Sequence, residues 1–234
     1  MKLKDFSFEL PEELIAQEPP EERGASRLFV LNRQNHTTAH TFVQQIVTYI
    51  PQNTIMVFND TRVRKARLLA QTETGGSCEL LLVEQLHDTV WKVMATRSKR
   101  LKIGKQLFLP DSVIGKVIED CEGFKVIEFT HPITETYMEQ FGHVPLPPYI
   151  RRSDTQRDAE RYQTVYATHM GSIAAPTAGL HFTPAILEDL RQHGIQIEFV
   201  TLHVGIGTFL PVRVQNIKEH TMHEEVYSIS DTTA

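Results

Sequence analysis

Six short apolar segments between Arg67 and Phe129 constrain the fold of this chain more than any other feature. Turn-forming pairs separate them, among them Gly75-Gly76, Pro110-Asp111 and Glu122-Gly123. Strands this short and this closely spaced are typical of a small β-barrel. The expected strands cover residues 67–72, 78–84, 90–94, 106–109, 113–119 and 124–129.

The flanking sequence mixes helix and strand patterns. Strands are expected at 28–31 and 54–58, with a helix at 42–50 that Thr41 would cap and Pro51 would end. A helix over 133–141 and a stiff proline-rich connector at 142–150 follow the barrel. We therefore expect an α/β fold. A mixed α/β domain (1–66 plus 149–234) would carry an inserted small β-barrel domain (67–148) that includes this helix and most of the connector.

The clearest local signal begins at Thr183, which suits a helix N-cap. Pro184 suits the first helical position, and Gly194 suits the helix stop. The strand expected at 195–203 alternates and places His203 at its carboxyl end. Ligands usually bind at that edge of an open α/β sheet.

Charge is distributed unevenly. The chain has a net charge of -5, yet ten basic and four acidic residues lie between Arg62 and Lys105. This segment would either bind a polyanion or form an ordinary solvated surface. The candidates for binding such a polyanion are Arg64, Lys65, Arg97, Lys99 and Arg100. No long apolar run and no signal-peptide pattern occur, so we expect a cytoplasmic protein without membrane contact.

Polar residues follow the strand expected at 54–58. Asp60 would act as a base or orient a ligand hydroxyl, and Arg62 would pair with a carboxylate or phosphate. Asn59 joins them as a binding candidate. The alternative is Asx-turn chemistry with a surface ion pair.

The segment 172–182 is rich in small side chains and includes the binding candidates Thr177 and Gly179. It would let a ligand approach the backbone closely, or simply form a tight turn against a sheet. A turn or helix is expected at 160–166, where Tyr162 and Tyr166 would pack or offer a stacking surface for a base. Tyr162 and Gln163 are the binding candidates in this segment.

Histidines cluster late in the chain. His181, His203 and His223 are proton-transfer candidates, although a hydrogen-bonded structural role is the alternative for each. His220 and His223 have a helical spacing, but no third ligand with a recognised spacing accompanies them. We therefore expect no metal.

Several segments together resemble one family. They are LPEELIAQ (10–17), ASRL (25–28), VFNDTRV (57–63), GHVPLPPYI (142–150), YQTVYA (162–167), AAPTAGLHF (174–182), FVTLHVGIGTF (199–209) and EHTMHEE (219–225). In this order they are similar to the S-adenosylmethionine:tRNA ribosyltransferase-isomerase family of queuosine biosynthesis. The resemblance runs nearly from end to end of the chain.

This resemblance implies an α/β domain with an inserted barrel, as expected above. It implies transfer and isomerisation of the ribosyl moiety of S-adenosylmethionine, a co-substrate rather than a cofactor. The acceptor would be 7-aminomethyl-7-deazaguanine at the tRNA wobble position, giving epoxyqueuosine with release of adenine and methionine. Asp60, His181, His203 and His223 would transfer protons, and the donor would bind near Arg62 and residues 175–179. A monomer is expected.

Two alternatives remain beside this one. Family members continue past Ala234 with motifs resembling GTTSVR and TNFHLPES, which do not occur here. The C-terminal part of the α/β domain is therefore expected to be missing, and the chain would then be a truncated, non-catalytic tRNA-binding remnant. An ordinary S-adenosylmethionine methyltransferase is disfavoured, because no Gly-rich motif follows the early strands.

Overall fold

The computed structural model describes residues 1–121 and 123–234, which form two compact units. Unit 1 comprises Met1–Arg62, Pro147–Ser153 and Glu160–Ala234, and unit 2 comprises Val63–Leu146 and Asp154–Ala159. The expected fold class is confirmed, since a closed barrel accompanies mixed helix and strand elements. The expected domain boundaries, at 66/67 and 148/149, imply two parts that each fold independently, and they stay a prediction.

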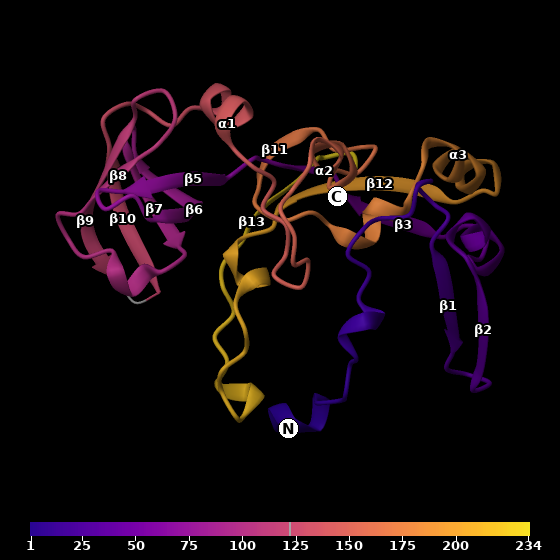
Figure 1. Ribbon diagram of the computed structural model, residues 1–234. Coiled ribbons are helices and arrows are strands. Elements are labelled where there is room, and N and C mark those ends of the chain that lie inside the picture. The colour runs from indigo at the N-terminus through magenta and orange to yellow at the C-terminus, as the bar shows by residue number, and fades with distance from the viewer. Residues whose placement is uncertain (122) are drawn as a thin grey trace. The chain divides into compact units, whose positions relative to one another are not determined.

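Unit 2 contains a closed antiparallel barrel with the strand order β10-β7-β6-β5-β8-β9 (Figure 1). All six expected strands are present with small shifts at their ends, and the turn residue Glu122 lies outside the described residues. The strands are β5 (Arg67–Thr72), β6 (Ser77–His87), β7 (Val90–Ala95), β8 (Gln106–Phe108), β9 (Ile114–Cys121) and β10 (Phe124–Phe129).

Alternating side chains fill the barrel interior. Leu68, Leu80 and Leu107 are fully buried there. Each buried leucine contributes about 1.5–3 kcal/mol through removal of apolar surface from water. Helix α1 (Glu135–Phe141) follows the barrel and begins two residues later than expected, because Thr134 is its N-cap and accepts a hydrogen bond from the Tyr137 amide.

Unit 1 is built around a three-stranded sheet with the order β13-β12-β3. Strand β3 (Ile55–Asn59) runs parallel to β12 (Gln196–His203), and β13 (Val226–Ile229) runs antiparallel to β12. Helix α3 (Pro184–Gln192) connects back into this sheet and has the expected caps: the Thr183 hydroxyl accepts from the Ile186 amide, and Gly194 has φ +81°. Ile186 and Leu190 pack with Phe58 and Ile195 to form its core.

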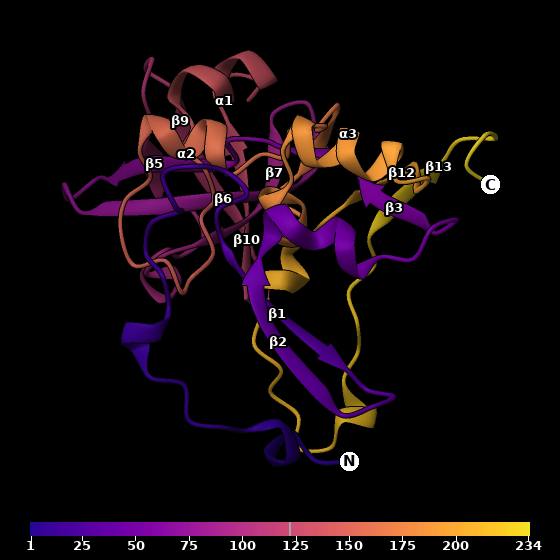
Figure 2. The same cartoon turned by 90° about the vertical axis from the view of Figure 1, so that its right-hand side faces the viewer.

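A hairpin of β1 (Arg27–Asn32) and β2 (Thr37–Phe42) precedes this sheet (Figure 2). The helix expected at 42–50 is present as a 3₁₀ helix, Val43–Tyr49, but the expected cap is wrong, because Thr41 lies in β2 and Phe42 is the N-cap. The Val43 amide donates to the Ser26 carbonyl, which ties the segment to the hairpin. The segment is also short and rich in β-branched residues, which disfavours an α-helix.

The strand expected at 54–58 and the turn or helix expected at 160–166 are both present. Strand β3 is an edge strand, and Ile55 and Val57 are exposed because only the face with Phe58 is covered by the core. Helix α2 (Gln156–Arg161) ends before Tyr162, so 162–166 forms a turn. The Gln163 carbonyl is held there by the Arg23 guanidinium at 2.9 Å instead of by a helical amide.

Short elements complete the described chain. The first two residues of β4 (Thr61–Val63) belong to unit 1, and β4 pairs with β11 (His169–Ser172). The other 3₁₀ helices are Leu3–Phe6, Glu12–Leu14, Ser98–Arg100, Thr177–His181, Ile206–Phe209 and Ile217–Glu219. Within the described residues, no helix combines the length and the apolar character that a bilayer span requires.

Candidate active site

Asp60 lies where the parallel strands β3 and β12 end, the edge at which a ligand was expected. Its amide donates to the Val200 carbonyl at 3.0 Å. The neighbouring Asn59 side chain donates to the Leu202 carbonyl at 2.9 Å and accepts from the Leu202 amide at 3.0 Å. The Asn59 side chain is thus bonded to backbone and fixes the start of the Asp60 loop, and its expected part in substrate binding stays a prediction.

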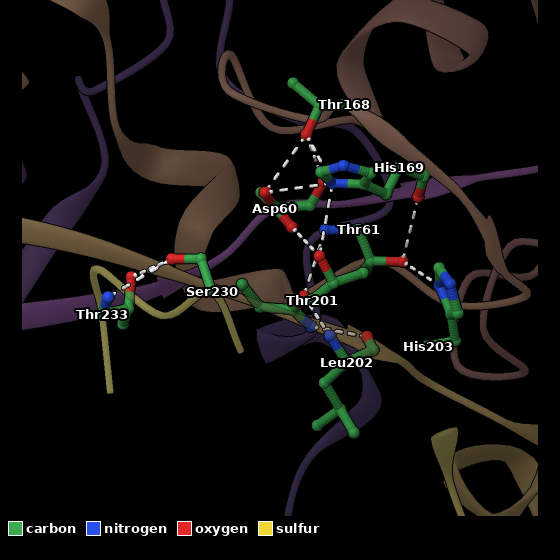
Figure 3. A network of polar contacts seen from close by, with 10 residues as sticks. Asp60, Thr61, Thr168, His169, Thr201, Leu202, His203, Ser230 and Thr233 are labelled. Carbon is green, nitrogen blue, oxygen red and sulfur yellow. Dashed lines mark hydrogen bonds and ion pairs between the residues drawn. The ribbon is translucent and has the colours of Figure 1, made fainter. Parts of the chain in front are cut away.

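Three side chains converge on the Asp60 carboxylate (Figure 3). The Thr201 hydroxyl donates to Oδ1 at 2.7 Å, and the Thr168 hydroxyl donates to Oδ2 at 3.2 Å. His169 Nδ1 lies 3.2 Å from Oδ2. The Asp60 side chain is only 13% exposed. These contacts fix the direction of the carboxylate, which a group that removes a proton requires.

His169 was not among the expected site residues. Its Nδ1 faces the Asp60 carboxylate, which only accepts hydrogen bonds, so we assign the ring proton to Nδ1. In the neutral ring, Nε2 is then the basic nitrogen. The ring is 63% exposed and can reach a ligand. His169 stands directly before the small-residue segment, and its nearness in sequence to that segment is the only signal that could have identified it.

A cavity of about 370 Å³ opens beside this network, within the size range of small-molecule sites. Asp60, His169 and Thr201 line it together with Phe199 and Glu198. The rest of its wall comes from β13 and the residues after it: Ser228, Ile229, Ser230, Thr232 and Thr233. Among the predicted site residues, Asp60 alone lines this cavity in the part of the chain that the structure describes.

His203 is held beside the network by Thr61. The fully buried Thr61 hydroxyl lies 2.8 Å from His203 Nδ1 and 3.5 Å from the His169 carbonyl. The His203 ring lies against Gly171, where a Cβ atom would come within 2.6–2.7 Å of three ring atoms. Only glycine leaves room for the ring at this position.

Arg62 follows Thr61 and alternates to the opposite side of β4, where it is exposed. Its guanidinium has no hydrogen-bond or ion-pair partner among residues 1–121 and 123–234. A free guanidinium next to the Asp60 loop remains able to pair with a carboxylate of a ligand.

A second group of expected residues gathers around Arg23. Its Nη1 donates to the carbonyls of Gln163 and Leu180, each at 2.9 Å. This holds the turn at Gln163 next to the segment that contains Gly179 and His181. Thr177, at the start of the same 3₁₀ helix, is exposed.

Burial shapes the ionisation of this second group. It raises the pKa of Tyr162 and of Tyr166 to about 12, so both stay neutral at physiological pH. Partial burial and then the charge of Arg23 lower the pKa of His181. A Cβ atom on Gly179 would lie 2.2 Å from the Tyr166 hydroxyl, so this glycine is needed for close packing.

The two groups meet through an aromatic cluster. The Tyr166 ring packs against Phe58 and Phe199, with centroids 5.2 and 5.5 Å away, and Phe199 lines the Asp60 cavity. His181 does not line that cavity. The exposed His223 lies elsewhere in unit 1, where a Cβ atom on Gly207 would be 3.1 Å from its Cδ2 atom.

The RNA-binding candidates in unit 2 fall into two classes. Arg64 forms an ion pair with Glu135 at 2.6 Å, and Lys65 with Glu139 at 3.0 Å. Arg97, Lys99 and Arg100 are exposed and have no carboxylate within 4.0 Å among the described residues. The second class therefore carries more available charge.

The described residues contain no group of three or more His, Cys, Asp or Glu side chains arranged to hold a metal ion. The expectation that no metal or cofactor takes part stays a prediction.

A family model described as "Queuosine biosynthesis protein" matches residues 3–234. The chain belongs to this family. It is 47% identical to the S-adenosylmethionine:tRNA ribosyltransferase-isomerase of Treponema denticola, covering all of this chain and 70% of that protein. It is 45% identical to the protein of the same name from Geotalea uraniireducens, with coverages of 100% and 69%. The expectation that the chain belongs to a family of queuosine biosynthesis and tRNA modification is thus confirmed.

A solved structure also matches this queuosine family member. It is the crystal structure of S-adenosylmethionine tRNA ribosyltransferase from Thermotoga maritima, at 30% identity. The match covers 95% of this chain and 60% of that one, and its TM-score of 0.37 adds nothing to the fold assignment. The chain therefore spans 60–70% of the length of these relatives.

Proposed function

We propose that this chain transfers and isomerises the ribosyl moiety of S-adenosylmethionine onto tRNA. The acceptor is 7-aminomethyl-7-deazaguanine at the wobble position. The product is epoxyqueuosine in tRNA, and adenine and methionine are released. The observation that carries this proposal is the Asp60 network beside a cavity, in a chain that matches its family over residues 3–234.

The first chemical requirement is a base. The sulfonium acidifies the adjacent carbon of the ribose, and a positioned group must remove a proton from it. Asp60 is our candidate because two hydroxyls aim its carboxylate beside the cavity. His169 joins as a second candidate through its exposed ring. His203, held by Thr61, stays a third.

The second requirement is binding of the donor and release of adenine. Arg62 is our candidate for the methionine carboxylate, since its guanidinium is otherwise uncommitted in the described chain. Release of adenine needs an acid. The lowered pKa of His181 makes its charged form scarce at neutral pH, so it suits the role of a base or hydrogen-bond donor better. His223 remains the candidate acid.

The acceptor tRNA needs a cationic surface, and Arg97, Lys99 and Arg100 are our candidates for it. Thr177, Gly179, Tyr162 and Gln163 stay candidates for contacts to the donor or the target base. A cytoplasmic monomer without a metal or cofactor remains a prediction.

The alternative proposal is a non-catalytic tRNA-binding remnant of the same family. The observation that favours it is the exposed cations of unit 2, Arg97, Lys99 and Arg100, which would bind RNA whether or not unit 1 carries out chemistry. It predicts RNA binding through unit 2 without chemistry in unit 1.

One experiment separates the two proposals. The chain is incubated with S-adenosylmethionine labelled in the ribose and with tRNA that carries the precursor base. The Treponema denticola relative serves as the positive control, and tRNA without the precursor as the negative one. Label that stays on tRNA, with stoichiometric adenine release, supports the transferase. A gel shift of tRNA without transfer, while the control relative is active, supports the remnant.

A further inference from the structure

A second cavity, of about 140 Å³, lies in the barrel unit at the end of the β5–β6 hairpin. The hairpin forms one wall, from Thr72 to Cys78. The other wall consists of Arg97, Arg100, Leu101, Lys105 and Gln106. Cys78 and Leu101 are each only 2% exposed and make an apolar floor. The cavity is therefore built within one unit.

The walls of this cavity are cationic. Arg97, Arg100 and Lys105 face a single acid, Glu73, which pairs with Lys105 at 3.0 Å. Both guanidinium groups are left without a carboxylate within 4.0 Å in the described chain. Hydroxyls of Thr74 and Ser77 add hydrogen-bonding groups. Guanidinium forks with hydroxyls are the groups that proteins use to bind phosphate.

Arg97 adopts a backbone conformation that side chains rarely take. Its φ and ψ are 55° and 28°, in the left-handed region. Glycine or asparagine occupies this region at lower cost. The conformation brings Nη1 of Arg97 to 3.4 Å from the Ser77 carbonyl, across the cavity. Strain kept at a charged, exposed residue points to function.

Gly76 keeps the cavity open. A Cβ atom at this position would lie 3.2 Å from the Thr72 hydroxyl and 3.8 Å from Nη1 of Arg97. The hairpin therefore leaves space in front of the guanidinium for an anion.

We propose that this cavity binds one backbone phosphate of the tRNA between Arg97 and Arg100. The inference rests on the proposed function only in taking tRNA as the partner, and it applies equally to a non-catalytic remnant. Free phosphate or pyrophosphate would offer the same chemistry, and the tests below distinguish these sources.

The first test measures tRNA binding against salt concentration. In the double variant Arg97→Gln/Arg100→Gln we expect at least tenfold weaker binding, and a slope of log K against log salt that is smaller by about 1–2. The matched control, Lys102→Gln/Lys116→Gln, removes two exposed charges from the same unit outside this cavity and should weaken binding less than threefold. Equal losses in both variants would show a diffuse surface and overturn the proposal.

The second test uses inorganic pyrophosphate as a probe. We expect it to shift the NMR Nε–Hε signals of Arg97 and Arg100, and we expect tRNA to displace it. If pyrophosphate shifts both signals and tRNA does not compete, the ligand is a small anion and the RNA assignment fails. An absence of any shift also overturns it.

The third test separates folding from binding. Arg97→Gly relieves the left-handed strain, so the melting temperature should not fall, while tRNA binding weakens. Unchanged tRNA binding in this variant would contradict the proposal. Failure of the transferase proposal looks different: wild-type chain would bind tRNA through this cavity without transferring label.

Discussion

The Thr201 hydroxyl donates a 2.7 Å hydrogen bond to Oδ1 of Asp60, which joins the interior of β12 to the loop after β3. The two residues are 141 positions apart. Their contact exists because β3 and β12 run parallel and end at the same edge. The carboxylate is thus aimed by the sheet itself, and a site held by regular strands is more precise than one on a free loop.

Removing the Thr201 hydroxyl should slow catalysis more than it affects folding. In Thr201→Val we expect about 10- to 100-fold slower label transfer, because a hydrogen bond to a charged group contributes about 1.5–3 kcal/mol. Thr201→Ser keeps the hydroxyl and should retain most of the rate. Single-turnover transfer to tRNA measures both. Equal rates for the valine and serine variants would show that this hydrogen bond does not matter.

Gly171→Ala should displace the His203 ring. The added Cβ would meet three ring atoms at 2.6–2.7 Å, so we expect a loss of about 1–3 kcal/mol in the free energy of unfolding. Urea denaturation measures this loss. The double variant Gly171→Ala/His203→Ala removes the clash and should be no less stable than His203→Ala alone. A strictly additive double variant would mean that the ring and residue 171 are not in contact.

The stability of the chain should depend on pH through His181. Burial and the charge of Arg23 lower the pKa of His181 below its ordinary 6.5, so the unfolded chain binds the proton more tightly. The contribution of His181 is therefore fully present above pH 6.5 and is lost as the pH falls toward the folded-state pKa. In His181→Asn the fall in unfolding free energy below this pH should be shallower. A parallel pH profile for the variant and the wild type would refute this.

The barrel holds a buried lysine with one carboxylate partner among the described residues. Lys125 is 2% exposed, and its Nζ lies 2.5 Å from Asp120. Asp120→Ala removes the one carboxylate partner that the described residues give this lysine, and it should cost about 3–5 kcal/mol. Lys125→Met removes the charge, keeps most of the side-chain volume and should change stability by less than about 1 kcal/mol. Thermal unfolding measures the loss of stability in each variant. A larger loss in Lys125→Met than in Asp120→Ala would contradict this prediction.

The sequence predicts those parts of the fold that local patterns specify. The strands β5 and β10 match their expected ranges in full, because alternation and Gly or Pro turns are read within a few residues. Helix α3 was equally clear from Thr183 and Gly194. The helix at Val43–Tyr49 was expected, but its 3₁₀ geometry was not predicted, because tertiary contacts such as that of Val43 with Ser26 decide it.

The candidate site was only partly predictable for the same reason. Asp60 and His203 were expected at strand ends, and they lie there. His169 contacts Asp60 from 109 positions away in the sequence, and Glu135 pairs with Arg64 from 71 positions away. Contacts between residues so far apart produce no local sequence pattern that would predict them. Whether the named residues bind or react stays a prediction.

The most direct test of the central claim is single-turnover transfer of ribose label to precursor-bearing tRNA by wild type and by Asp60→Asn. Asparagine keeps the shape of the side chain and removes its charge. We predict that wild type labels the tRNA, and that the variant is at least about 100-fold slower while it binds tRNA within threefold of wild type. Transfer at the wild-type rate by Asp60→Asn would contradict the account, because the carboxylate would then have no part in the chemistry.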